Sequence, residues 1–362
     1  MPLCEKLSDL FPHPIVQGPM AGGANTPAMV AAVSNSGALG SLGASLLPPD
    51  VIREQVAQIR ALTDKPFAIN LFVQETPNPD AQTVAQAMQY LAPVWQELGM
   101  EAPAAPQKWC EDFASQFALL LELKPAVASF TFNVLQPGQV AALHAAGIVV
   151  VGTATTLEEA LAWQSAGADA VVASGIESGG HRGTFLVPQE HATLSVWELG
   201  PQVCQALQIP VILAGGFMHG ADIAAALKAG ASAVQMGTAF LVTDESGIHP
   251  AYKQRLLDCA KTPDAPQPTC LTRSFSGRYA RGLDNRFMHM MYPVEVIVPA
   301  YPVQNALTGS LRAQAGKLGN TEFMSLWAGT RVQAARAMSC AQLVQTLVRE
   351  WQADSQVETS LL

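Results

Sequence analysis

Short apolar segments alternate with amphipathic, helix-like segments along most of this chain, and this alternation limits its fold more than any other feature. Short apolar runs are typical of buried strands, and helices between successive strands are typical of parallel sheets. Eight such runs are Ile15–Gln17, Ala38–Leu42, Phe67–Phe72, Val127–Phe132, Ile148–Gly152, Ala170–Ala173, Val211–Ala214 and Ala233–Met236. Eight strands with intervening helices predict a closed α/β barrel of the (β/α)8, or TIM, type.

Helical patterns fill the intervals between these strands. They are predicted at Pro27–Ser34, Pro49–Leu62, Gln139–Ala145, Leu157–Ser165, Val196–Leu207 and Ala221–Lys228. Three predicted helices end in an Ala-Gly pair directly before a strand, with the glycines at Gly147, Gly167 and Gly230. Glycine tolerates the left-handed conformation that ends a helix, so these pairs indicate repeated helix-to-strand turns.

Two segments exceed the simple barrel pattern. Residues 74–124 form a long insertion after the third strand, with predicted helices near Ala81–Leu98 and Trp109–Leu123. Because the carboxyl ends of barrel strands form the mouth, we expect this insertion to lie over it. Residues 261–362 are predicted to form a C-terminal extension that packs on the barrel, with an exposed loop at Thr262–Pro268 and a helix at Glu322–Leu347. We expect residues 1–362 to form one domain, since barrels often exceed 250 residues.

The charge pattern and the cysteines exclude several functional classes. The chain has a net charge of -9, and its basic residues are scattered, which argues against nucleic-acid binding. Residues 1–10 lack the apolar core of a signal peptide, and no apolar run approaches the roughly 20 residues that span a bilayer. The six cysteines match no metal-binding spacing, and we expect free thiols, no metal site and a cytoplasmic location.

Two motifs lie at the ends of the first and third predicted strands. Gln17–Gly23 is rich in glycine and includes Met20, and glycines let a backbone approach a flat ligand closely. Asn70 ends the third strand, and its amide both donates and accepts hydrogen bonds, which suits a flavin ring edge. Taken alone, the first motif is equally consistent with a tight turn, and an asparagine at a strand end is more often an ordinary turn residue.

The loop Glu177–Gly183, after the sixth strand, is the most informative motif. Three glycines surround His181 at the end of the barrel where active sites lie. Histidine exchanges protons near neutral pH, so His181 is a candidate base toward a carbon acid. Arg182 either stabilises an anion or fixes the loop. The alternative is a surface loop in which the histidine has no chemical role.

Two more glycine-containing turns follow the seventh and eighth strands. They contain Gly215 and Gly216, and Gly237 and Thr238. Many barrels bind phosphate there on backbone N–H groups, although ordinary turns also use glycine. The chain has neither the P-loop nor the Rossmann glycine pattern, which favours FMN over ATP or a dedicated dinucleotide domain.

Together these segments resemble the nitronate monooxygenases, formerly called 2-nitropropane dioxygenases. The resemblance rests on Gln17–Gly23, Gly40–Ala44, Asn70–Val73, Glu177–Gly183, Leu213–Gly216, Gln235–Thr238, Phe275–Phe287 and Tyr301–Arg312. Flavin-dependent enoyl-reductases of the same barrel carry a similar Gly-Gly-His loop. The resemblance implies an FMN site. Its implied contacts are Met20, Asn70 and Lys124 near the ring or ribityl chain, and Gly180, Gly215, Gly216, Gly237 and Thr238 around the phosphate.

The resemblance also implies a reaction. His181 would face the substrate, and Tyr301 and Gln304 would close its pocket. The implied activity is oxidation of alkyl nitronates, and of nitroalkanes, by FMN and O2 to carbonyl compounds and nitrite, in a monomer or homodimer. Asn305 and Gly309 depart from the family pattern, which has Tyr and Lys there, and this leaves the substrate open. An NAD(P)H-dependent reductase of enoyl-thioesters or quinones, and a non-catalytic flavin-binding protein, are the alternatives.

Overall fold

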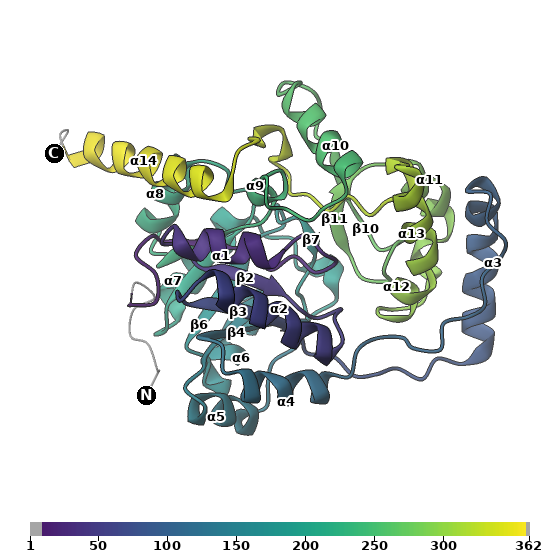
Figure 1. Cartoon of the computed structure of the whole chain (residues 1–362), viewed down its shortest axis with the longest axis horizontal. Helices are drawn as coiled ribbons and strands as arrows, with labels where there is room; N and C mark the ends of the chain where they lie inside the picture. Colours follow the sequence, from purple (N-terminus) through teal and green to yellow (C-terminus); the bar gives the residue numbers. More distant parts are fainter. Residues whose placement is uncertain (1–8, 360–362) are drawn as a thin grey trace.

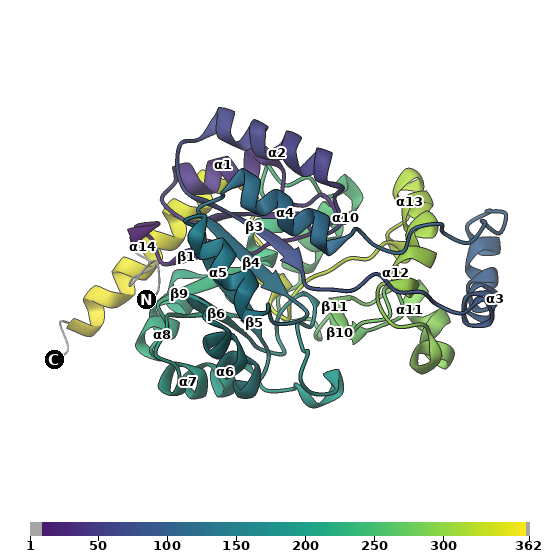
Figure 2. The ribbon, with the colours of Figure 1, turned by 90° about the horizontal axis from the view of Figure 1, so that it is seen from below.

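Eight parallel strands form a barrel in the computed structural model, which describes residues 9–359 (Figures 1 and 2). The strands are β1 (Ile15–Gln17), β2 (Gly40–Gly43), β3 (Phe67–Phe72), β4 (Val127–Thr131), β5 (Val149–Ala154), β6 (Ala170–Ser174), β8 (Val211–Ala214) and β9 (Ala233–Met236). Their order is β1-β9-β8-β6-β5-β4-β3-β2. The backbone amides of Gln17 and Leu39 donate to the carbonyls of Leu39 and Ile15, both at 2.9 Å, and close the barrel between β1 and β2. The predicted (β/α)8 fold is confirmed.

Alternating side chains of the strands build two separate apolar cores. One set packs against the surrounding helices, as Ile15 and Val150 do. The other set forms a separate cluster, which alternation along the strands places inside the barrel. Its strand residues are Val16, Ala68, Val127, Val149, Val151, Ala170, Val172, Ile212, Ala214 and Ala233. The interior is therefore filled with side chains, and space for a ligand remains only at an open end.

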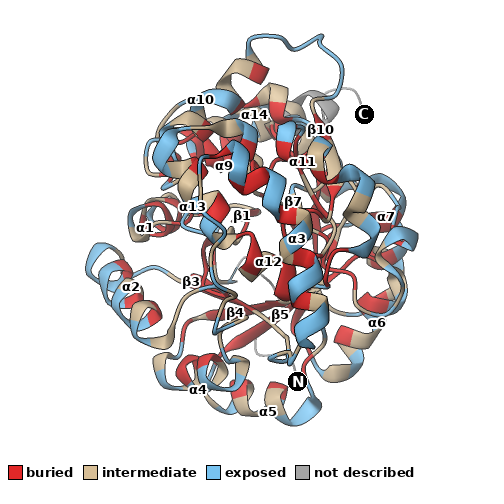
Figure 3. Cartoon of the chain, turned by 90° about the vertical axis from the view of Figure 1, so that its right-hand side faces the viewer, coloured by how far each residue is buried: buried red, intermediate tan, exposed pale blue. Residues whose placement is uncertain are grey.

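Helices surround the barrel in the predicted order, with their outer faces exposed and the strands buried (Figure 3). They are α1 (Pro27–Asn35), α2 (Pro49–Leu62), α4 (Phe113–Leu123), α5 (Pro137–Ala145), α6 (Leu157–Ala166), α7 (Val196–Ala206), α8 (Gly220–Lys228) and the short α9 (Thr238–Leu241). Gly147, Gly167 and Gly230 have φ values of 79°, 97° and 100°. The Ala-Gly turns therefore use the left-handed conformation that the sequence indicated.

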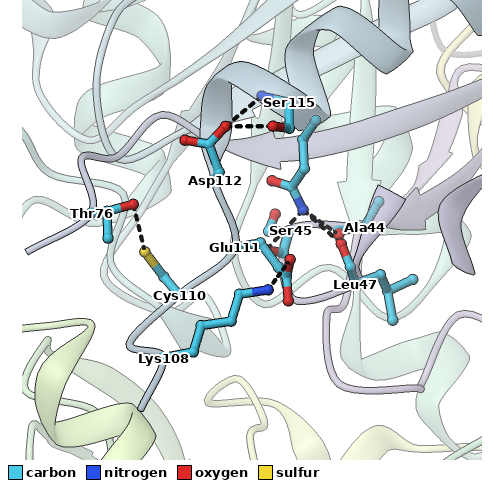
Figure 4. Close-up of polar contacts among 10 residues, drawn as sticks. Ala44, Ser45, Leu47, Thr76, Lys108, Cys110, Glu111, Asp112 and Ser115 are labelled. Carbon is cyan, nitrogen blue, oxygen red and sulfur yellow. Dashed lines mark hydrogen bonds and ion pairs between the residues drawn. The ribbon is translucent and has the colours of Figure 1, made fainter. Parts of the chain in front are cut away.

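The insertion after β3 differs from its predicted place. Its second helix, α4, is the barrel's own helix between β3 and β4, and it packs on β3 and α2. Asp112 caps α4 through the Ser115 amide at 2.8 Å (Figure 4). The buried Gln116 donates to the Leu47 carbonyl at 2.8 Å and so attaches α4 to the loop after β2. Only α3 (Ala81–Glu97) and its flanking segments project from the barrel.

Helix α3 lies outside the C-terminal helices rather than directly on the barrel (Figure 2). It packs on α11 (Arg286–Met291) and α12 (Val303–Leu307). Arg286 Nη2 donates to Glu97 Oε2 at 3.0 Å and joins α11 to α3. The C-terminal helices therefore stand between α3 and the barrel mouth.

The C-terminal extension is more varied than a helical layer. After α10 (Pro250–Ala260) and the exposed loop predicted at Thr262–Pro268, it contains strands, helices and 3-10 turns. These are β10 (Thr269–Thr272), β11 (Ala280–Leu283), α11, η3 (Tyr292–Ile297), α12, α13 (Gly309–Leu318), η4 (Thr321–Phe323), η5 (Val332–Ala334) and α14 (Cys340–Thr359). Helix α14 packs on α8 and α1, outside the barrel (Figure 1).

The helix predicted at Glu322–Leu347 was wrong from Glu322 to Ser339. Regular helix begins only at Cys340. In the preceding segment the backbone amides are used elsewhere, since Gly329 N donates to Thr238 Oγ1 at 2.9 Å and Thr330 N to the Glu177 carbonyl at 3.0 Å. These contacts with the barrel loops replace the bonds that a helix would have made.

Cys110, Cys204, Cys259, Cys270 and Cys340 are free thiols, while Cys4 and the N-terminal segment 1–8 lie outside the described residues. Between residues 9 and 359, no helix combines the length and apolar character that crossing a bilayer requires. Over the same residues, no group of three or more His, Cys, Asp or Glu is arranged to hold a metal ion.

Candidate active site

A cavity of about 620 Å³ opens at the carboxyl ends of the strands, where barrel active sites lie. Small-molecule and cofactor sites have volumes of about 300–1,000 Å³, so this cavity has room for a cofactor. Most of the predicted site residues line it: Met20, Asn70, Gly180, His181, Gly215, Gly216, Gly237, Thr238 and Tyr301. The barrel loops and the C-terminal extension therefore build one site from residues far apart in the sequence.

The loop after β1 is held in shape by the buried Asn25. Its Oδ1 accepts from the backbone amides of Met20 and Gly43, which ties this loop to the end of β2. Gly22 has a φ of 91° and lines the cavity, and a Cβ added to it would meet no atom within 4 Å. The loop thus presents a side-chain-free surface beside Met20.

Asn70 ends β3 with its side chain fixed by neighbouring hydroxyls. It is almost fully buried, and its Nδ2 donates to Ser129 Oγ at 3.0 Å and lies 3.4 Å from Thr131 Oγ1. Because both hydroxyls belong to β4, the amide has a set orientation at the cavity wall. Such a fixed amide is suited to recognising the polar edge of a ring.

His181 lies on a short strand that the sequence did not reveal. Gly180 and His181 form β7, which pairs antiparallel with β11, and β11 pairs with β10. Strands β10 and β11 belong to the C-terminal extension, and their pairing with β7 holds the histidine loop over the barrel mouth. The motif predicted as a glycine loop is therefore a rigid element with His181 paired opposite Ala280.

The hydrogen bonds around His181 define its tautomer. Its Nε2 lies 2.8 Å from Ser276 Oγ, and that same Oγ lies 3.0 Å from the Arg278 carbonyl oxygen. Because a carbonyl only accepts, the Ser276 proton goes to Arg278, and Nε2–H donates to Ser276. The lone pair of neutral His181 is therefore on Nδ1.

Burial keeps His181 neutral at physiological pH. Burial and, to a smaller extent, the positive charges of Arg278 and Arg312 together lower the pKa of His181 from 6.5 to about 3. His181 therefore holds its Nδ1 lone pair available as an acceptor. With a pKa this far below neutrality, it is a weak base toward a carbon acid.

Aromatic side chains form the wall around His181. The rings of Phe132, Tyr301 and Trp327 lie 5.9, 5.8 and 5.4 Å from its ring, measured between centroids. Phe132 has a φ of 84°, which is unusual for a non-glycine residue and is typical of functional sites. The Arg278 guanidinium lies over the Phe132 ring at 4.1 Å and donates through Nε to the Arg182 carbonyl at 2.8 Å. The wall is apolar and firmly held.

Glycines and one hydroxyl form the other end of the cavity. Gly215 and Gly216 have φ values of 138° and 73°, conformations that side chains rarely adopt. Thr238 Oγ1 accepts from Gly329 N at 2.9 Å, so its own proton remains available to a ligand. Arg331 lies beside this end, with Nη1 3.2 Å from the Gly216 carbonyl. These groups suit an anionic oxygen, such as that of a phosphate.

Arg182 supports the loop and does not face the ligand. It is buried, and it donates to the carbonyls of Gly175, Ser174 and Ala192 at 2.5, 3.1 and 3.2 Å. Of the two roles that the sequence allowed for Arg182, the structure favours fixing the loop.

Two predicted site residues lie away from the cavity. Lys124 is exposed and ends α4, at the amino end of β4, so it faces the opposite end of the barrel. Gln304 is fully buried behind the wall, where its Nε2 donates to the Ser274 carbonyl at 2.8 Å. Lys124 was assigned to the site because it lies next to β4 in the sequence. It precedes that strand, however, and only residues that follow a strand reach the carboxyl end of the barrel. Gln304 instead supports the segment that carries Ser276.

Sequence reasoning did not single out Ser276, Arg312 or Trp327. Ser276 contacts His181, while Arg312 and Trp327 line the cavity. The first two fall in the segments Phe275–Phe287 and Tyr301–Arg312 that carried the family resemblance, so that resemblance was their only signal. Trp327 lies in the segment predicted as helix, where nothing pointed to the cavity.

The fold and the cavity are those of a barrel oxidoreductase, and comparisons with known proteins agree. Residues 4–350 match the nitronate monooxygenase family, to which the chain belongs. It is 42% identical over 342 residues to the nitronate monooxygenase of Pseudomonas aeruginosa, covering 93% of this chain and 96% of that protein. It is 38% identical over 338 residues to the probable nitronate monooxygenase of Bacillus subtilis, covering 93% and 95%.

Solved structures support the same assignment. Nitroalkane oxidase from Streptomyces ansochromogenes is 40% identical, with a TM-score of 0.88, covering 98% of this chain and 99% of that one. FabK from Thermotoga maritima is 28% identical, with a TM-score of 0.75 and 98% of each chain covered. The chain is therefore an oxidoreductase of the nitronate monooxygenase family.

Proposed function

We propose that this enzyme binds FMN in the cavity and oxidises alkyl nitronates with O2 to carbonyl compounds and nitrite, and nitroalkanes less efficiently. The observation that carries the proposal is a neutral His181, with its Nδ1 lone pair free, at the mouth of a glycine-lined cavity. The family membership supports the same reaction.

The cavity residues fit FMN. A Cβ added to Gly180 would meet no atom within 4 Å, so this glycine leaves open space that a side chain would occupy. Gly215, Gly216, Gly237 and the free proton of Thr238 would hold the phosphate. Met20 and Asn70 would contact the ring. Among the described residues, no acidic side chain lines the cavity to repel the phosphate. FMN would supply the electron-accepting ring that protein side chains lack.

The protein's own groups favour a substrate that is already an anion. A neutral nitroalkane must first lose a carbon-bound proton, and the available acceptor is His181 Nδ1. Because the pKa of His181 is about 3, its imidazole has little affinity for the proton that this transfer delivers. A nitronate needs no such transfer, and the positive charge of Arg312, which lines the cavity, favours an anion. The aromatic wall excludes water from the reacting carbon.

The deciding experiment is an anaerobic absorbance spectrum of the FMN-reconstituted protein, mixed separately with propyl-2-nitronate and with NADH. We expect the flavin bands to change with the nitronate and to stay unchanged with NADH. On admitting air, acetone and nitrite should accumulate while O2 is consumed. Bleaching by NADH alone would replace the proposal with a reductase, and a protein that takes up no FMN would overturn the cofactor assignment.

A further inference from the structure

The charges in the cavity are unbalanced. Within residues 9–359, the lining includes Arg312 and Arg331 but no aspartate or glutamate. Arg331, beside Gly216, pairs with Asp222 at 2.5 Å. Arg312 lies at the other end, with Tyr301 and Asn305, and it forms no ion pair with any acid in residues 9–359. A cationic group with no anionic partner is costly to enclose, so its position calls for an anionic ligand.

The contacts of Arg312 hold one side of its guanidinium and leave the other donors unused. Its Nη2 donates to the backbone oxygen and to Oδ1 of Asn305, at 2.7 and 3.0 Å. Its Nε has no hydrogen-bond partner within the described chain. A guanidinium that is fixed at one nitrogen and free at others is suited to a planar oxyanion. Asn305 is therefore a positioning residue for Arg312.

A second unused donor lies beside the first. The Tyr301 hydroxyl is buried and has no hydrogen-bond partner among residues 9–359. Its ring lies beside His181, with 5.8 Å between centroids, and Tyr301 lines the same cavity as His181 and Arg312. Unpaired buried donors of this kind are rare in folded proteins and indicate a missing acceptor.

Helix α13 leaves space for that acceptor. Gly309 lies one turn before Arg312 on the same face of α13, and both line the cavity. A Cβ added to Gly309 would meet no atom within 4 Å. The approach to the guanidinium is thus open.

We propose that Arg312 and the Tyr301 hydroxyl bind the nitronate oxygens. This inference rests on the proposed nitronate oxidation. The cavity thereby selects the nitronate anion over the neutral nitroalkane. A neutral nitro group gains less from a guanidinium than an anion does, because its oxygens carry no net negative charge to attract the cation. Arg312 is then the residue that determines the charge specificity of the site.

The test measures binding separately from turnover. Isobutyrate has the shape and charge of propyl-2-nitronate but cannot be oxidised in the same way, and isobutyramide is its neutral counterpart. In calorimetric titrations, Arg312→Gln should weaken isobutyrate binding by roughly ten- to a hundred-fold. Isobutyramide binding should stay within about threefold of that to the unaltered enzyme. Arg349→Gln, an exposed arginine on α14, is the matched control and should change neither.

A second pair of variants covers the case in which Arg312→Gln fails to fold. Gly309→Asp places a carboxylate beside the guanidinium, and Gly309→Asn adds the same volume without charge. We expect the aspartate to lower isobutyrate affinity at least about tenfold relative to the asparagine. Equal isobutyrate affinities for the two variants would overturn the proposal. So would an Arg312→Gln protein that loses isobutyrate and isobutyramide equally, since that pattern indicates a structural role.

Kinetics link the site to the reaction. Arg312→Gln should raise the KM for propyl-2-nitronate and leave that for 2-nitropropane nearly unchanged. An unchanged nitronate KM in an enzyme that does oxidise nitronates would contradict the role of Arg312. An unaltered protein that binds isobutyrate through Arg312, yet oxidises no nitronate, would refute the proposed function and retain the anion site.

Discussion

At the scale of single residues, the site depends on where one proton lies. The Ser276 hydroxyl donates its hydrogen bond to the Arg278 carbonyl, which leaves His181 as the donor through Nε2 and frees Nδ1. Burial and two arginines then keep the ring neutral. These contacts join β7 to a turn almost a hundred residues later in the sequence, so the sequence revealed His181 as a candidate but not its tautomer or its weak basicity.

Replacing His181 by asparagine should separate the two substrate classes. Oxidation of 2-nitropropane requires a base, so kcat/KM for it should fall by about 10²-fold or more. Propyl-2-nitronate is already deprotonated and should lose less than about tenfold. Steady-state O2 consumption measures both. Equal losses would show that His181 does not act as the base.

The pH dependence of nitroalkane oxidation follows from the lowered pKa of His181. The folded protein holds the neutral base form at all pH values well above about 3. From pH 5 to pH 7, kcat/KM for 2-nitropropane should therefore show no loss attributable to protonation of His181. A decline centred near pH 6.5, which disappears in His181→Asn, would mean that the imidazole titrates as an exposed histidine does.

At the scale of elements, the sequence predicts a helix or strand correctly when neighbouring residues determine it. The prediction fails where contacts with distant parts of the chain determine the structure. The eight barrel strands were predicted because each is a short buried run with its own helix following it. The segment from Met324 to Ser339 was mispredicted because its backbone bonds to distant loops, through Thr238 and Glu177. The strand β7 has two residues and exists only because β11 pairs with it, so no local pattern signals it. Most of the cavity was predictable for the same reason as the strands: its glycines follow strand ends.

The contact between β5 and α6 provides a test of element packing. A Cβ on Gly152 would lie 2.0 Å from Trp163 Cδ2, and Trp163 is fully buried. Gly152→Ala should destabilise the fold by about 3 kcal/mol, since neither the strand nor the ring has space to move. Urea denaturation followed by circular dichroism measures this loss. Gly138→Ala in α5 meets nothing within 4 Å and should be neutral or stabilising by up to about 1 kcal/mol, so equal effects of the two changes would contradict the packing argument.

At the scale of the whole molecule, the cavity brings together parts of the chain that lie far apart in the sequence. Its lining extends from Gly18, after β1, to Arg331 in the C-terminal extension, with α13 forming one side. No residue between Phe72 and Thr131 lines it, so α3 and its flanking segments contribute nothing directly. A ligand in this space contacts barrel loops and extension together, and its binding energy therefore stabilises their association.

FMN should accordingly raise the thermal stability of the entire chain, and riboflavin should raise it less. At about a hundred times its dissociation constant, a ligand that binds only the folded state contributes about 2.7 kcal/mol, or a Tm increase of roughly 5 °C. Riboflavin has the same ring but no phosphate, so it cannot accept hydrogen bonds from the donors around Gly216 and Thr238. Differential scanning fluorimetry of the flavin-free protein with each compound measures the difference. Equal shifts at equal concentrations would mean that the glycine turns after β8 and β9 do not bind a phosphate, while a larger shift with FMN would assign them that role.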